Sequence, residues 1–137
     1  MTSRIELKLP SQMAYLGIPD AVLMEIGSDL DCPREIIEEL GTAVIEACTN
    51  AMEHGNGLDS AQAVELHIDV NRDRIVVAVL DHGRGFDYAN WQPASDILRE
   101  RGRGILIMRE FTDQLDYDRT PDGRFRVRLV KRLARAE

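Results

Sequence analysis

Three polar residues lie on one side of a helical stretch, EACTNAMEHG, at residues 46–55. At about 100° per residue, Glu46, Asn50 and Glu53 project within roughly 60° of one another. An asparagine carbonyl can bind Mg²⁺, and a carboxylate one helical turn earlier can orient or deprotonate a nucleophile. The same stripe is also compatible with a solvated helix face, so the rest of the chain must decide between the two interpretations.

Two glycine-containing segments farther along the chain have chemistry of their own. Asp81 ends an apolar run and is followed by Gly83 and Gly85. Glycines let a flat ring approach the backbone, and the carboxylate can accept a hydrogen bond from an exocyclic amine. Residues 102–104, Gly-Arg-Gly, precede an apolar helical segment, and N–H groups at a helix N-terminus favour phosphate. An ordinary Asp-x-Gly turn and a helix-entry loop are the plain alternatives.

Hydrophobic periodicity predicts the elements that must position these segments. Short runs rich in β-branched and apolar residues, most of them alternating with polar ones, predict strands at 3–9, 63–70, 74–81, 114–119 and 124–133. Helices are expected at 11–30, 33–54 and 105–111. Pro19 should kink or break the first helix, because proline lacks an N–H group and clashes with the preceding turn.

Residues 82–101 show no steady periodicity and contain Gly83, Gly85 and Pro93, which predicts a long loop. Loops of this length inside compact domains are usually functional. The resulting order is strand, two helices, hairpin, loop, helix and hairpin. This order predicts an α+β fold, a two-layer sandwich in which helices cover one face of a mostly antiparallel sheet.

Composition limits the possible partners. The 137 residues suffice for one domain, residues 1–137, with a single hydrophobic core. A net charge of −7 repels phosphate backbones and anionic membranes, so neither nucleic acid nor a membrane is expected as a direct partner. Three basic residues near the C-terminus, Arg124, Arg126 and Arg128, alternate with apolar residues, which is typical of the solvated face of a strand.

The cysteines and the N-terminus indicate the compartment. Cys32 and Cys48 do not have the spacing of metal ligands. The first residues lack the apolar run of a signal peptide, and no segment reaches the roughly 18 apolar residues of a membrane span. We therefore expect reduced thiols and a cytoplasmic protein.

Taken together, the three polar segments resemble a known set of motifs. EACTNAMEHG, DHGRGF and GRGILIM resemble the N box and the two glycine boxes of the GHKL (Bergerat) ATPase fold. The longer stretches ELGTAVIEACTNAMEHGNG and RERGRGILIMREFTDQLDY resemble, within that group, the bacterial anti-sigma factor serine kinases of the RsbW type. The similarity extends over almost the whole chain, from about residue 5 to residue 132.

The resemblance implies roles for the first two motifs. Glu46 matches the catalytic base of the N box, and Asn50 matches the asparagine that coordinates the Mg²⁺ bridging the ATP phosphates. Asp81 matches the aspartate that holds the adenine amine. Gly83 and Gly85 match the glycines that shape the wall of the adenine pocket.

It also implies roles for the third motif and the loop before it. Gly102 and Gly104 match the second glycine box, whose backbone contacts the phosphates. Residues 86–101 correspond to the ATP lid. Arg103 is the basic residue assigned to the phosphates, with Arg101 as the alternative.

By the same resemblance, the function is that of an ATP-dependent serine protein kinase and anti-sigma factor in a partner-switching pathway. Such a protein sequesters a sigma factor and phosphorylates a serine of a small anti-anti-sigma antagonist of the STAS type. Its cofactors are ATP and Mg²⁺. A homodimer is expected from the family, with the first strand as a possible contact.

Two other hypotheses stay open. The first is a module that binds ATP and sequesters a partner without kinase activity. The second, the catalytic part of a histidine kinase, requires a histidine in a two-helix dimerisation segment, and none of His54, His67 and His82 lies in one. At the end of the motif helix, His54 is compatible with a capping role or a ligand contact, and Glu53 is placed on the solvated side.

Overall fold

The structure is a computed structural model that describes residues 2–91 and 100–133, except for the side chains of Glu100 and Arg101. Its strands are β1 Ser3–Pro10, β2 Ala63–Val70, β3 Arg74–Asp81, β4 Gln114–Arg119 and β5 Phe125–Arg132. Its α-helices are α1 Gly17–Asp29, α2 Arg34–Asn50 and α3 Glu100–Phe111. Shorter helical turns occur at Met13–Tyr15, Ala51–Gly55 and Tyr88–Asn90.

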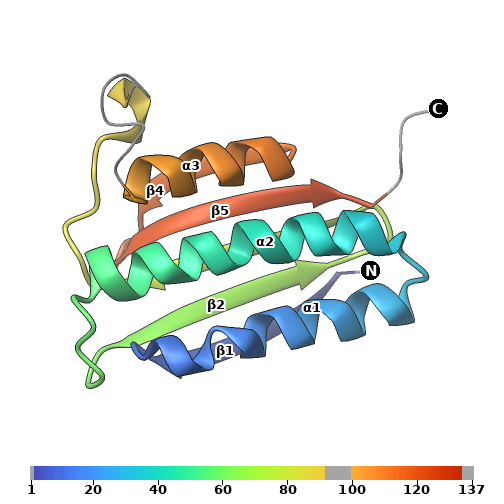
Figure 1. The fold of residues 1–137 in the computed structure, drawn as a ribbon, viewed down its shortest axis with the longest axis horizontal. Helices are drawn as coiled ribbons and strands as arrows, with labels where there is room; N and C mark the ends of the chain where they lie inside the picture. The colour runs from blue at the N-terminus through green and yellow to red at the C-terminus, as the bar shows by residue number, and fades with distance from the viewer. Residues whose placement is uncertain (1, 92–99, 134–137) are drawn as a thin grey trace.

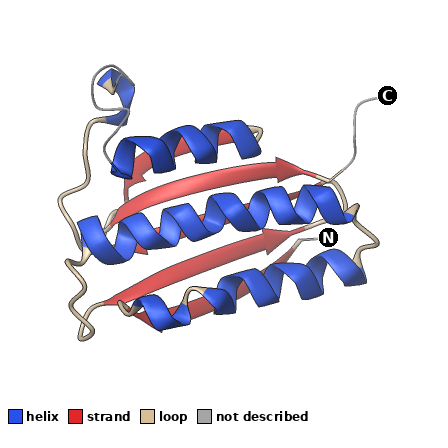
Figure 2. Cartoon of the chain, viewed as in Figure 1, coloured by secondary structure: helices blue, strands red, loops and turns tan. Residues whose placement is uncertain are grey.

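The strands form one sheet in the order β1-β2-β3-β5-β4, and each of the four described strand pairs is antiparallel. The three helices lie side by side in a second layer over one face of this sheet (Figures 1 and 2). The predicted α+β sandwich is thus confirmed. The central position of β3 matters for function, because β3 ends at Asp81 directly beneath the helical layer.

The core lies between the two layers and follows from the periodicity of the sequence. Strand β2 turns Val64, Leu66, Ile68 and Val70 toward the helices, while the residues between them stay half-buried on the other face. Helix α2 supplies the matching apolar stripe, which consists of Ile36, Ile37, Leu40, Ala43, Val44, Ala47 and Cys48. Burying these side chains is the main stabilising contribution, at about 25 cal/mol for each Å² of apolar surface.

The opposite face of the sheet has no helix over it among the described residues, and it carries the charged alternation of the last strand. Arg128 is exposed, whereas Val127 and Leu129 on either side of it are buried. Arg126 forms a bidentate pair with Asp118 of β4, with nitrogen to oxygen distances of 2.8 and 2.6 Å. The interpretation of these arginines as the solvated face of a strand is confirmed.

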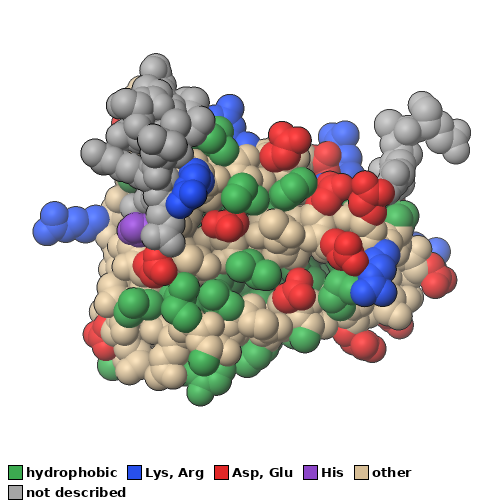
Figure 3. Space-filling view, in the orientation of Figure 1, with side chains coloured by type: hydrophobic (Ala, Val, Ile, Leu, Met, Phe, Trp, Pro, Cys, Tyr) green, Lys and Arg blue, Asp and Glu red, His purple; other side chains and the backbone are tan. Residues whose placement is uncertain are grey.

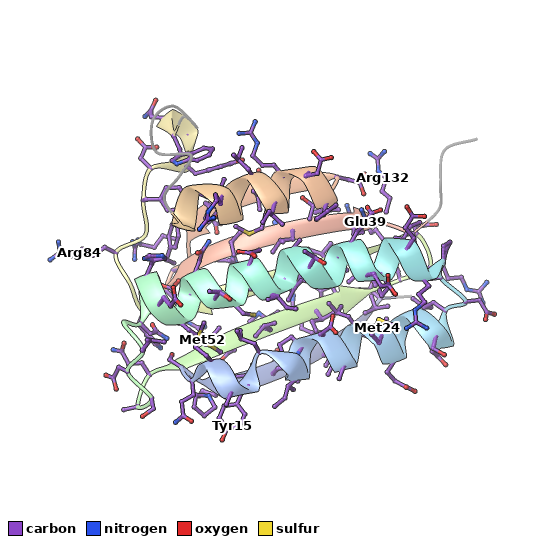
Figure 4. The ribbon with its side chains drawn as sticks, in the orientation of Figure 1. Tyr15, Met24, Glu39, Met52, Arg84 and Arg132 are labelled. Atoms are coloured by element: carbon purple, nitrogen blue, oxygen red, sulfur yellow. The ribbon has the colours of Figure 1, made fainter. Side chains whose placement is uncertain are left out.

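The buried side chain of Lys131 links the sheet to the helical layer at the C-terminal end of α3. Lys131 of β5 is 8% exposed, and its Nζ donates to Glu39 Oε2 of α2 at 2.7 Å and to the carbonyl of Phe111 at 2.8 Å. Glu39 is labelled in Figure 4 between α2 and β5. Lys131 therefore satisfies a carbonyl at the C-terminus of α3 and fixes that end beside α2.

The prediction of a kink at Pro19 was wrong. The helix begins at Gly17, so Pro19 is its third residue, and the segment from Ser11 to Leu16 contains only a short helical turn. Proline is tolerated in the first turn, because the N–H groups there have no intrahelical acceptor. The break that we assigned to Pro19 thus falls before the helix.

Two further boundaries differ from the predictions. The motif helix is α-helical only to Asn50 and continues over Ala51–Gly55 as a π-helical turn, with the N–H of Asn56 donating to the carbonyl of Ala51 at 2.8 Å. This wider turn changes the angle between residues, so Glu53 no longer continues the stripe of Glu46 and Asn50. Helix α3 begins at Glu100, so residues 102–104 lie inside the helix and do not precede it.

The long segment between β3 and α3 is described in part. Tyr88–Asn90 forms a short helical turn, in which Asp87 accepts a hydrogen bond from the N–H of Asn90. Residues 92–99 of the expected ATP lid lie outside the described residues.

The buried thiol on α2 gives a test of the core. Burial raises the pKa of Cys48 to about 12, whereas an unfolded cysteine ionises at a pKa of about 8.5. The unfolded state therefore releases a proton in this window that the folded state keeps, and stability must fall as the pH rises. Between about pH 8 and pH 10, the wild type should lose about 2 kcal/mol more than Cys48→Ala in urea titrations under reducing conditions. Equal pH dependence in both proteins would contradict this burial.

Candidate functional site

The N-terminal end of α3 meets the last turns of α2, and a glycine makes the contact possible. A Cβ atom at Gly104 would lie 3.0 Å from Glu46 Oε2 and 3.3 Å from Asn50 Nδ2. Any larger residue at this position would occupy the space in front of these two polar groups. The structure thus brings Gly104 next to Glu46 and Asn50, which precede it by more than fifty residues in the sequence.

Asn50 has the most unusual environment of the three. Its side chain is 9% exposed, and its Nδ2 is buried with no hydrogen-bond partner among the described residues. A buried polar group without a partner costs about 1–3 kcal/mol, and most buried polar groups in native proteins are paired. An unpaired amide beside a backbone that carries no side chain is therefore a place where a polar ligand would be stabilised.

Asp81 lies across from Asn50 at the end of β3, with 5% of its surface exposed. Its Oδ1 accepts a hydrogen bond from the N–H of Gly83 at 2.7 Å. Its carboxylate packs directly on the π-helical turn, since a Cβ at Gly55 would lie 2.3 Å from Asp81 Cγ. A Cβ at Gly83 would in turn lie 2.6 Å from the Cα of Gly55. These three residues can approach so closely only because two of them are glycines.

Gly85 is required by the aromatic ring that it contacts. Its φ of +70° lies in the left-handed region, and a Cβ there would lie 2.3 Å from Cδ1 of Phe125. Phe125 belongs to an aromatic cluster in which Tyr117 lies 4.9 Å from Phe86 and 4.7 Å from Tyr88 between ring centroids. The segment after β3 therefore leaves the sheet along this cluster.

A narrow cavity of about 10 Å³ lies between α2 and the sheet, lined by Ala47, Asn50, Ala51, Asp81, Tyr117, Phe125 and Val127. Its walls are those expected of a purine pocket, with apolar faces and one carboxylate. A purine ring system is larger than this cavity. A base could therefore enter this cavity only if some of its lining side chains moved.

The remaining predicted residues belong to the first turns of α3. Gly102 is buried and Arg103 is exposed. Because both lie within the first four residues of the helix, their positions are at its electropositive end. Gly104 is the fifth residue of the helix, beyond the first four N–H groups. It contributes to the site by leaving space in front of Glu46 and Asn50.

Three contact residues were missed by sequence reasoning. Gly55 directly follows the helix predicted at 33–54, and this position next to the motif helix is a usable signal. Asn56 is buried and its Oδ1 accepts from the N–H of His82 at 2.7 Å. Arg119 donates to the carbonyl groups of Gly83 and Arg84. No local pattern could reveal the role of Arg119, because these contacts span about 35 residues.

None of the helices in the described part of the chain combines the length and the apolar character of a membrane span.

Comparisons with known proteins identify the family of the chain. The profile of the histidine kinase-like ATPase domain family matches residues 9–131. The chain is 34% identical over 120 residues to "Serine-protein kinase RsbW" of Bacillus subtilis (strain 168), which covers 81% of this chain and 75% of that protein. It is 35% identical to the protein of the same name from Bacillus licheniformis, with the same coverage.

Solved structures show the same fold at lower identity. The blue-light activated histidine kinase of Erythrobacter litoralis EL346 is similar with a TM-score of 0.57 and 22% identity, over 90% of this chain and 42% of that chain. The histidine kinase domain of the same protein is similar with a TM-score of 0.57 and 23% identity, and 61% of it is covered. The chain thus spans less than two thirds of either structure, and these similarities concern the fold alone.

The close approach at Gly104 can be tested by adding one methyl group. Gly104→Ala should fold normally, because alanine is favoured over glycine inside a helix by about 1 kcal/mol. The new Cβ would crowd Glu46 and Asn50, so the Kd for Mg-ATP measured by calorimetry should rise roughly tenfold or more. Gly17→Ala is the matched control, since no heavy atom lies within 4 Å of its added Cβ. Unchanged affinity in Gly104→Ala would mean that the ligand lies elsewhere.

Proposed function

We propose that this chain, which belongs to the histidine kinase-like ATPase family and within it to the RsbW-type serine-protein kinases, binds Mg-ATP between α2 and β3 and transfers its γ-phosphate to a serine of a partner protein. The observation that carries the proposal is the buried Nδ2 of Asn50, which has no hydrogen-bond partner among the described residues, beside Glu46 and the open space at Gly104. A structural role in the core does not explain a buried amide nitrogen that the described residues leave without an acceptor.

Different residues of the site bind the adenine and the metal. Asp81 accepts a hydrogen bond from the exocyclic amine of adenine, and Gly83 and Gly85 leave room for the ring beside it. Asn50 would hold Mg²⁺ with its carbonyl oxygen, because rotation of the amide exchanges its oxygen and nitrogen. When bound, Mg²⁺ would supply the positive charge that stabilises the triphosphate.

Glu46 acts on the incoming serine. As the hydroxyl oxygen forms its bond to the γ-phosphorus, the bond from that phosphorus to the bridging oxygen breaks and ADP leaves with the electron pair. The carboxylate of Glu46 accepts the hydroxyl proton, which is general-base catalysis. Arg103 and the first N–H groups of α3, including that of Gly102, stabilise the transferred phosphoryl charge.

The physiological role that we propose is partner switching. The chain sequesters a sigma factor and phosphorylates a STAS-domain anti-anti-sigma antagonist. A phosphoserine adds about −1.5 to −2 charge. The kinase has a net charge of −7, and Asp and Glu side chains are spread over its helical face (Figure 3). Repulsion between like charges then weakens the complex with the phosphorylated antagonist and frees the kinase for its other partner.

A homodimer and a cytoplasmic location complete the proposal. Strand β1 is an outer strand of the sheet, and it pairs with β2 along one side. Its other side offers backbone groups that a second copy can pair with.

Substitution of Glu46 tests the assigned base. Glu46→Gln keeps the size and polarity of the side chain but removes its basicity, so phosphate transfer from labelled ATP to the STAS antagonist should fall about 10²–10⁴-fold. The Kd for Mg-ATP should change little, because the base acts on the serine. Glu53→Gln, on the π-helical turn, is the matched control and should retain wild-type transfer.

Two outcomes would contradict the proposal in different ways. Undiminished transfer in Glu46→Gln would remove the role given to Glu46. A wild-type protein that Mg-ATP stabilises but that transfers no phosphate to the antagonist would favour the ATP-binding, partner-sequestering module.

A further inference from the structure

The turn that follows Asp81 is held from outside by side chains of two distant elements. It comprises residues 81–85, and its backbone groups are paired with atoms that belong neither to the turn nor to β3. A turn that served only to end a strand would not need such contacts, since water can satisfy the backbone groups of an exposed loop.

Asn56 holds the turn from the side of α2. Its Oδ1 accepts from the N–H of His82 at 2.7 Å. Its Nδ2 donates to Ser11 Oγ at 3.0 Å and to the carbonyl of Ala63 at 3.2 Å. One buried amide thus ties the residue after Asp81 to the start of β2 and the end of β1.

Arg119 holds the turn from the side of the β4–β5 hairpin. Its guanidinium donates to the carbonyl of Gly123 at 2.8 Å, to that of Gly83 at 3.4 Å and to that of Arg84. The same group lies 5.8 Å from the ring centroid of Phe125, within the range of a cation–π contact. Arginine suits this position, because its rigid fork reaches several acceptors at once.

Arg84 illustrates that the contact concerns the backbone of the turn. The side chain of Arg84 is exposed and extends away from the rest of the fold (Figure 4). Its carbonyl group accepts a hydrogen bond from Arg119. Arg119 therefore contacts the turn through backbone groups, and the Arg84 side chain takes no part in that contact.

Gly83 links the Arg119 contact to the Asp81 carboxylate, because its backbone bonds to both. Its N–H donates to Asp81 Oδ1 at 2.7 Å, while its carbonyl accepts from Arg119. The neighbouring N–H, that of His82, donates to Asn56. Any rotation of the peptide groups in the turn would thus move the donor that orients the Asp81 carboxylate.

We propose that Arg119 and Asn56 are positioning residues that fix the Asp81 carboxylate and thereby make the site selective for a 6-aminopurine over a 6-oxopurine nucleotide. This proposal rests on the proposed ATP site. An amine donates to the carboxylate, whereas an oxo group presents an acceptor to it and is repelled. The repulsion discriminates only if the carboxylate cannot move away, so selectivity depends on a rigid turn.

The test compares ATP with inosine triphosphate, which carries an oxo group in place of the 6-amino group. The Kd of each nucleotide with Mg²⁺ is measured by calorimetry on the full chain. In Arg119→Met, the ratio of the two Kd values should fall at least tenfold from its wild-type value. Arg119→Lys keeps the charge but cannot reach several carbonyl groups, so its ratio should fall as well.

Arg126→Met is the matched control. Arg126 lies on the adjacent strand, makes two hydrogen bonds to Asp118 and is 29% exposed in its side chain. It makes none of the hydrogen bonds to the backbone of residues 81–85 described above, so its substitution should leave the nucleotide ratio at the wild-type value. Asn56→Ala should lower the ratio as Arg119→Met does, although its burial predicts a lower melting temperature too.

The outcomes separate this inference from the proposed function. A wild type that binds ATP more tightly than inosine triphosphate, with an unchanged ratio in folded Arg119→Met and Arg119→Lys, overturns the role of Arg119 alone. A wild type that binds both nucleotides equally also overturns the inference while leaving the ATP site intact. A folded wild type that binds neither nucleotide overturns the proposed function and this inference together.

Discussion

The close approach of α3 to α2 is the constraint on which the site depends. Lys131 fixes one end of α3 beside Glu39, and Ile105 and Met108 of α3 are fully buried in the core. At the other end, the missing side chain of Gly104 leaves Glu46 and Asn50 facing the helix backbone. The apolar packing thus places the polar side chain of Asn50 in a space that the described residues leave open, and its Nδ2 has no hydrogen-bond partner among them.

Local patterns were sufficient to predict the scaffold and the polar stripe. Alternation identified β1, β2 and β5 closely, because one face of β2 and β5 is buried and the apolar residues of β1 are at least half-buried. A 3.6-residue period identified α2. The π-helical turn and the start of α3 at Glu100 were missed, since both depend on tertiary contacts. The contacts of Gly55 and Arg119 with the turn after Asp81 join segments far apart in sequence, and no periodicity encodes them.

The fold is supported by solved structures of low sequence identity, whereas the function is supported by relatives of higher identity. The solved structures with a similar fold are parts of a histidine kinase, but at 22% and 23% identity they bear on the architecture only. The serine-protein kinases are 34% and 35% identical over most of the chain.

Of the histidines, His67 lies on the open face of the sheet and contacts Glu65 at 2.6 Å, on the side away from Asn50.

The most direct test of the account is the side-chain amide signal of Asn50 in a two-dimensional ¹H–¹⁵N spectrum, assigned by its loss in Asn50→Ala. Addition of Mg-ATP should shift this signal more than the corresponding signals of Asn56, Asn71 and Asn90. ATP with a chelator in place of Mg²⁺ should shift it less. If the Asn50 signal stays in place when Mg-ATP is saturating, the buried amide does not face the nucleotide, and the account is contradicted.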